Sequence, residues 1–338
     1  MPLPLFFIGI AAASGGVGLG KTIKAGIDSS VANKINKSAN QIVNESTTYL
    51  NVQREASGDA LRHLGEQKIY ILNNNMTEFL DTFTQLKNVD FKEAEGLSEL
   101  SKLHIDEKDF IELKNLCNFA ISLAGGSVAG VAGGALATFG AYGAAQALAC
   151  ASTGTAISAL SGAAATNATL AFFGGGSLAA GGLGMAGGTA VLGGLVAGPA
   201  LLAMGFVAGS AAKKSLEKAK TNRLEAVQLA EELDTASKKC EAIRRRTYMF
   251  YNVLARLDSY FMPFIYKMQD IVQKEGYDYK QFSDESKKSI ASCVSTAASI
   301  KAVLDTQLLT DDGLLTDESN DILVNTEEFI NNIIFMKQ

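Results

Sequence analysis

The chain of 338 residues contains no Trp, only four Pro and only two His, His63 and His104. So few prolines favour long uninterrupted helices, because proline removes a backbone donor and clashes inside a helix. Two isolated histidines form no cluster with acidic or thiol side chains at a spacing typical of a metal site or an acid–base pair. We therefore expect no metal, no cofactor and no enzymatic activity.

Cysteine is also scarce, with Cys117, Cys150, Cys240 and Cys293 far apart in the sequence. This spacing favours free, buried thiols in a reducing compartment over a disulfide framework. The net charge is −5 and the pI is about 5.3. An acidic chain of this kind is not expected to bind nucleic acid in general.

Charge is missing altogether from one stretch, Asn115 to Ala212. These 98 consecutive residues contain no Asp, Glu, Lys, Arg or His and carry 22 of the 33 glycines. A surface of this length in water needs charge, so we expect the stretch either in lipid or inside a jacket of other helices. Leu and Phe, which insert most strongly, are sparse in it, and intermediate hydrophobicity suits a segment that is first buried and later inserted.

In lipid the stretch is long enough for two to four helical spans, since each needs about 20 residues. Lysines on both flanks favour an even number of spans. Glycines recur at every fourth position, which places them on one helix face and allows close helix–helix approach. We expect these glycines to mediate membrane packing and homo-oligomerisation: Gly126, Gly130, Gly134, Gly184, Gly188, Gly194, Gly198, Gly205 and Gly209.

The N-terminal segment, residues 1–22, has three interpretations. It has the apolar core of a signal peptide but no basic start. Gly15, Gly20, Lys21 and Thr22 match a P-loop, whose backbone would bind phosphates. A plain apolar helix is the third interpretation. We favour the third because no apolar strand ending in an acidic residue follows the motif.

Residues 24–88 are expected to be helical, with an apolar face of Ile27, Val31, Ile35, Ala39, Ile42, Tyr49, Val52 and Ala56 and a break at Ser57–Gly58. After the uncharged stretch, apolar residues recur in steps of three and four without interruption, which predicts a long coiled-coil helix. These positions are Ala226, Leu229, Leu233, Ala236, Cys240, Ile243, Thr247, Phe250, Leu254, Leu257 and Phe261. Region 24–88 is the expected partner, in an antiparallel stalk with the Gly-rich stretch at one end.

Three further patterns concern helix ends. Pro263 is expected to kink or end the coiled-coil helix near residues 260–264. Ser283 is expected to cap a following helix, and Thr316 to precede the last one. The chain then divides into an apolar N-terminal segment (1–22), an amphipathic helical region (23–114), the membrane-insertion segment (115–212), a long coiled-coil helix (213–275) and a C-terminal helical region (276–338).

Several runs carry a resemblance to a known family. They are STGTAISALSGAAATNATLAFFGGGSLAAGGLGMAGGTAVLGGLVAGPALL from Ser152 onward, the start MPLPLFFIGIAAASGG, and the segment DTQLLTDDGLLT. With them, most of the chain resembles a bacterial family of uncharacterised glycine-zipper helical membrane proteins, to which no activity can be assigned residue by residue. The organisation is also similar to α-helical pore-forming toxins such as cytolysin A and colicin pore domains, and to apolipoprotein L.

We expect an all-α protein in which long antiparallel coiled-coil-like helices flank a Gly/Ala-rich hydrophobic segment. The expected function is membrane insertion, as a pore-forming or permeabilising toxin or defence effector. Its partners would be the lipid bilayer and further copies of the chain, and its location a membrane or a cytoplasmic form that inserts. The alternatives are a membrane-anchored scaffold that recruits a protein through the coiled coil, and a P-loop nucleotide-binding protein.

Overall fold

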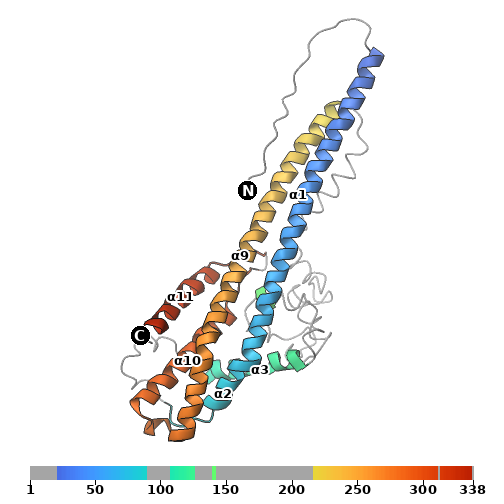
Figure 1. Cartoon of the computed structure of the whole chain (residues 1–338). Coiled ribbons are helices and arrows are strands. Elements are labelled where there is room, and N and C mark those ends of the chain that lie inside the picture. Colours follow the sequence, from blue (N-terminus) through green and yellow to red (C-terminus); the bar gives the residue numbers. More distant parts are fainter. Residues whose placement is uncertain (1–20, 90–106, 126–138, 142–215, 311–312, 337–338) are drawn as a thin grey trace.

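The computed structural model describes residues 21–89, 107–125, 139–141, 216–310 and 313–336 (Figure 1). These residues form helices and no strand, so the protein is all-α as expected. The helices are α1 (Lys21–Ile71), η1 (a π-helical turn, Leu72–Met76), α2 (Thr77–Phe83), α3 (Glu107–Gly125), α9 (Leu216–Glu275), η7 (Tyr279–Gln281), α10 (Asp284–Asp305) and α11 (Glu318–Met336).

Helices α1 and α9 pack along each other and form a stalk (Figure 1). All eleven positions of the three-and-four pattern in α9 are buried. In the upper stalk a narrow core contains Ala39, Val43, Leu50, Ala226, Leu229, Leu233, Ala236 and Cys240. The predicted coiled-coil helix and its partner region are therefore confirmed.

The two stalk helices are parallel, and the antiparallel prediction was wrong. Both run in the same direction in Figure 1, from the free end of the stalk toward the bundle. Three contacts give the register, and both residue numbers rise together along them. They are Asn222 Nδ2 to Asn36 Oδ1 at 3.0 Å, Ser57 Oγ to the carbonyl of Cys240 at 2.7 Å, and Asn75 Nδ2 to Asp258 Oδ1 at 2.7 Å.

The error has a physical cause. Apolar residues at heptad spacing mark the face that a helix buries, but the same spacing serves parallel and antiparallel partners. The relative direction of α1 and α9 therefore depends on the length of the chain that connects them. The segment between Ile71 and Leu216 is long enough to return along the whole stalk, so a parallel arrangement is possible. As a consequence, α1 and α9 both begin at the free end of the stalk.

Neither predicted interruption ends a helix. α1 continues through Ser57 and Gly58, because the Ser57 hydroxyl is buried against α9 and donates to the Cys240 carbonyl. α9 contains Pro263 and continues to Glu275. Proline leaves the carbonyl four residues earlier without its helical donor. Pro263 and Ser259 both lie on the exposed side of α9, where water can reach that carbonyl.

The apolar face predicted for the first half of α1 is partly wrong. Val31, Tyr49 and Val52 are 39%, 48% and 54% exposed. Ala39 of the predicted face is buried, but the other residues of the buried seam are Ala32, Val43 and Leu50, which were not predicted. The face of α1 that is buried depends on its register with α9, for example with Ala226 and Leu229, and the sequence of α1 alone carries no information on that register.

The lower end of the stalk widens into a bundle in which η1, α2, α3, α10 and α11 pack around α1 and α9 (Figure 1). Four phenylalanines contact one another at its centre, with ring centroids of the contacting pairs 5.0–6.4 Å apart: Phe79, Phe83 and Phe110 are stacked, and Phe261 is tilted against Phe79. The predicted helix starts are confirmed. Ser283 Oγ accepts the Ser286 amide at 3.2 Å, and Thr316 Oγ1 accepts the Ser319 amide at 3.1 Å.

Candidate functional site

A short part of the uncharged stretch, residues 139–141, lies against the bundle. Phe139, Gly140 and Ala141 are all buried. The carbonyl of Ala141 accepts hydrogen bonds from the amides of Leu308 and Leu309, at 2.9 and 3.2 Å. We call residues 139–141 the docked tripeptide.

Gly140 is placed so tightly against α1 that only glycine fits. A Cβ at this position would lie 2.0 Å from the carbonyl oxygen of Leu61. That atom belongs to a helix backbone, so it has little freedom to move aside. The docked tripeptide is therefore held on one side by α1 and on the other by the chain that follows α10.

Lys68 of α1 lies directly under the docked tripeptide. Its side chain is 1% exposed. Its Nζ donates to the Phe139 carbonyl at 3.3 Å and to the Leu304 carbonyl at 3.5 Å, and lies 5.8 Å from the centroid of the Phe139 ring. Burial lowers the pKa of Lys68 from 10.5 to about 7, although the negative charge of Asp305 opposes the shift.

A second set of charged side chains connects α10 to α3. The uncharged stretch begins within α3. Lys301 Nζ lies 2.6 Å from Asp305 Oδ2 and 3.2 Å from Glu112 Oε2. Burial raises the pKa of Asp305 against the opposing effect of Lys301. Burial lowers the pKa of Lys301, but its hydrogen bond and charge contact with Asp305, together with Glu112, raise it overall. Charged side chains this poorly hydrated are stable only while paired.

α3 attaches the first residues of the uncharged stretch to η1. Leu116, Cys117 and Ala120 are buried there. Burial raises the pKa of the Cys117 thiol to about 12, and it also raises the pKa values of Cys240 and Cys293. These three thiols form no disulfide, as expected. Their raised pKa values keep them protonated, and a protonated thiol is not the reactive form. Cys150 lies outside the described residues.

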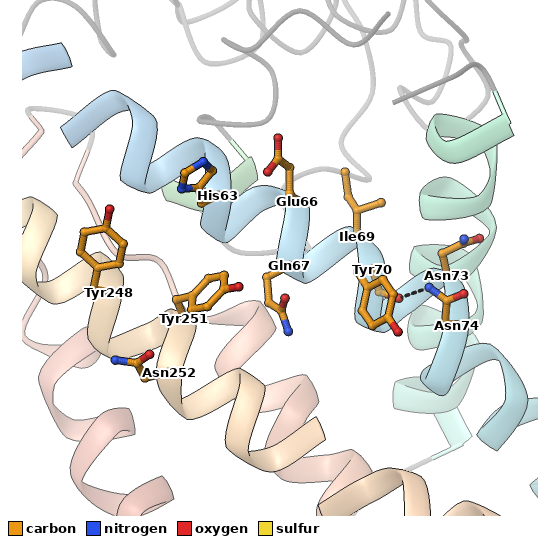
Figure 2. Close-up of a pocket in the computed structure, with 10 residues that line it drawn as sticks. All are labelled: His63, Glu66, Gln67, Ile69, Tyr70, Asn73, Asn74, Tyr248, Tyr251 and Asn252. Atoms are coloured by element: carbon orange, nitrogen blue, oxygen red, sulfur yellow. Dashed lines mark hydrogen bonds between the residues drawn. The ribbon is translucent and has the colours of Figure 1, made fainter. Parts of the chain in front are cut away.

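A cavity of about 820 Å³ opens between α1 and α9 beside this region (Figure 2). Figure 2 shows polar and aromatic side chains from both helices around it, and the one hydrogen bond drawn runs from Asn74 Nδ2 to the Tyr70 carbonyl at 2.8 Å. Its lining includes one imidazole, from His63, and one carboxylate, from Glu66. Its lining consists of His63, Glu66, Gln67, Ile69, Tyr70, Asn73, Asn74, Tyr248, Tyr251 and Asn252.

The nine predicted zipper glycines, Gly126 to Gly209, lie outside the described residues, and so do Gly15 and Gly20 of the P-loop match. Lys21 and Thr22 are the first two residues of α1. Within the described ranges, no group of three or more His, Cys, Asp and Glu side chains lies together in a way that suits a metal ion.

Lys68 was not predicted as a site residue, although the sequence contains a signal for it. Lys68 follows Leu61 and Leu64 and precedes Ile71 at spacings of three and four, so it falls on the buried face of α1. A lysine in such a position either extends to the surface or remains buried with partners.

No family model, no curated protein and no solved structure matches this chain. In the part of the chain that the structure describes, none of the helices has the length and apolar character needed to cross a bilayer.

Proposed function

We propose that this protein is a membrane-inserting helical protein that permeabilises a bilayer by releasing its uncharged segment from the bundle. The support is the combination of two features. One is a stretch of 98 residues without an ionisable side chain. The other is the docked tripeptide, through which this stretch is held on the bundle over a buried lysine.

The contact between the docked tripeptide and the bundle is of a kind that can be broken without unfolding the stalk. Toward the described part of the bundle, the docked tripeptide contributes the carbonyls of Phe139 and Ala141 as hydrogen-bond acceptors and one buried aromatic side chain. It also keeps Lys68 away from water, which costs free energy whenever the amine is charged. Releasing residues 139–141 would hydrate the lysine while the seam between α1 and α9 remains closed.

The test is release of an encapsulated dye from liposomes by protein purified without detergent. Wild-type protein is expected to release the dye. Replacing Gly126, Gly130 and Gly134 by Leu is expected to abolish release, because bulky residues prevent close helix packing in the membrane. The matched control replaces the same glycines by Ala, which preserves small side chains and much of the activity. Sealed vesicles with wild-type protein would contradict the proposal.

The two alternative functions have less support. A scaffold was expected to recruit its partner through the coiled coil, but the apolar seam of α9 is covered by α1. A nucleotide-binding role for Gly15, Gly20, Lys21 and Thr22 requires a parallel sheet beside the loop, and the described residues contain no strand. Lys21→Ala tests this role, since loss of nucleotide binding in that variant would support it.

A further inference from the structure

We propose that the free end of the stalk is the surface that first contacts the membrane, and that it recognises anionic lipid headgroups. We define the stalk tip as residues 30–41 of α1 and 216–227 of α9, which the Asn36–Asn222 contact holds side by side. The inference rests on the proposed function. It goes further by naming the end of the molecule that meets the bilayer and the class of lipid that this end binds.

The charge of the stalk changes sign along its length. The tip carries five exposed basic side chains and two exposed acidic ones. The basic ones are Lys34, Lys37, Lys218, Lys220 and Arg223, and the acidic ones are Glu217 and Glu225. The next section of the stalk, residues 42–60 and 228–243, carries seven acidic and three basic side chains. Of these two sections of the stalk, the tip is therefore the basic one, and the next basic run, Arg244 to Arg246, lies lower on α9, where Arg245 pairs with Glu241 and Arg246 donates to Ser319.

The parallel direction of the helices strengthens this positive end. Each helix has a partial positive charge at its N-terminus, where amide N–H groups lack helical acceptors. α9 begins at the tip and α1 begins nine residues before it, so the positive ends of both helices lie at the same end of the stalk as these lysines. In an antiparallel stalk, one dipole would oppose the other.

The same end is where the apolar parts of the chain join the stalk. The N-terminal segment, which is uncharged until Lys21, leads directly into α1. The uncharged stretch ends at Ala212, four residues before α9 begins at Leu216. Attraction of the tip to anionic headgroups would therefore hold the attachment points of both apolar segments at the bilayer surface.

Each lysine or arginine near an anionic surface contributes attraction that salt weakens. The test is flotation of full-length protein with two kinds of vesicle, phosphatidylcholine alone and phosphatidylcholine mixed with phosphatidylserine, at low and high salt. The tip variant is K34Q/K37Q/K218Q/K220Q. The control variant is K267Q/K274Q/K280Q/K288Q, which removes four exposed lysines at the bundle end and changes net charge equally.

At low salt, wild-type and control proteins are expected to prefer the anionic vesicles, and the tip variant is expected to bind them about one thousandfold more weakly. A tip variant that binds anionic vesicles as well as the control overturns the inference and leaves the proposed function standing. Wild-type protein that binds and permeabilises neither vesicle contradicts the proposed function itself. The inference would also be overturned if the tip variant lost binding to single-stranded RNA but still bound anionic vesicles as wild-type protein does.

Discussion

Lys68 should give the stability of the bundle a pH dependence of its own. Its pKa is lowered from 10.5 in water to about 7 in the folded protein, chiefly by burial. Between these two values the unfolded chain holds the proton and the folded chain has lost it. Stability therefore rises with pH across this window, and below pH 7 the cost of the buried charge is fully present.

We expect wild-type protein to gain on the order of 5 kcal/mol from this group between pH 7 and pH 10.5, relative to Lys68→Met. The measurement is chemical denaturation of both proteins at several pH values. The difference between them is the readout, because other groups also titrate in this range. Parallel stability curves for the two proteins would mean that the lysine reaches water in the folded state.

The Asn36–Asn222 contact should determine the register of α1 against α9, and it should contribute little to the free energy of unfolding. Both side chains are buried in a seam that is otherwise apolar. Replacing Asn222 alone by Leu removes the donor to Asn36 Oδ1, and we expect a loss of about 1–3 kcal/mol in thermal or denaturant unfolding.

The double variant Asn36→Leu/Asn222→Leu should recover most of that loss, since two apolar groups then face each other. If the double variant were as unstable as the single one, the amide pair would be a net source of stability. Register can be checked in the same proteins, because a seam without its polar pair is freer to shift.

Among the elements, the docked tripeptide offers the most direct test of packing. Gly140→Ala places a methyl group against the Leu61 carbonyl, so residues 139–141 must move away. We expect the amides of Leu308 and Leu309 to exchange with solvent about tenfold faster or more, since Ala141 is their acceptor.

Gly58→Ala is the matched control, because it lies in the same helix as Leu61 and a Cβ there meets nothing within 4 Å. Alanine at such a helical position should stabilise α1 by about 0.5–1 kcal/mol. Amide exchange at Leu308 and Leu309 should be unchanged in this variant. Equal exchange in both variants would show that the tripeptide contributes no protection.

The sequence was sufficient to predict the class of fold, the seam of α9 and the starts of α10 and α11. These depend on local spacing and on capping residues, such as Ser283, that act within one turn. It did not predict the direction of the stalk or the exposed positions of Tyr49 and Val52. Those depend on register with a helix far away in the sequence, for which a single chain carries no pairing information.

The candidate site was harder to predict for the same reason. Lys68, Gly140 and Leu308 come from three distant segments, and each has an ordinary sequence context. Lys68 alone carried a usable signal, its place on the apolar face of α1. The close approach of Gly140 to Leu61 had none, because the surrounding residues contain many similar glycines.

Parallel packing of α1 and α9 separates the two points at which the uncharged stretch meets the described helices. Gly140 lies at Leu61, which is 25 residues beyond Asn36 along α1, or about 38 Å at a rise of ~1.5 Å per residue. α9 begins about 9 Å beyond the Asn36–Asn222 contact in the other direction. The stretch thus starts on the bundle and rejoins the described chain at the tip.

This arrangement can be measured with pairs of spin labels on exposed stalk positions, in a variant whose four natural cysteines are replaced by Ala. Lys34 and Lys220 lie at the same level of the parallel stalk, so labels there should be about 10–25 Å apart. Lys239 lies 19 residues beyond Lys220 along α9, which predicts about 29 Å between Lys34 and Lys239. An antiparallel stalk with its ends aligned would reverse the order of the two distances. It would also separate the beginnings of α1 and α9, and the basic tip would no longer exist as one surface.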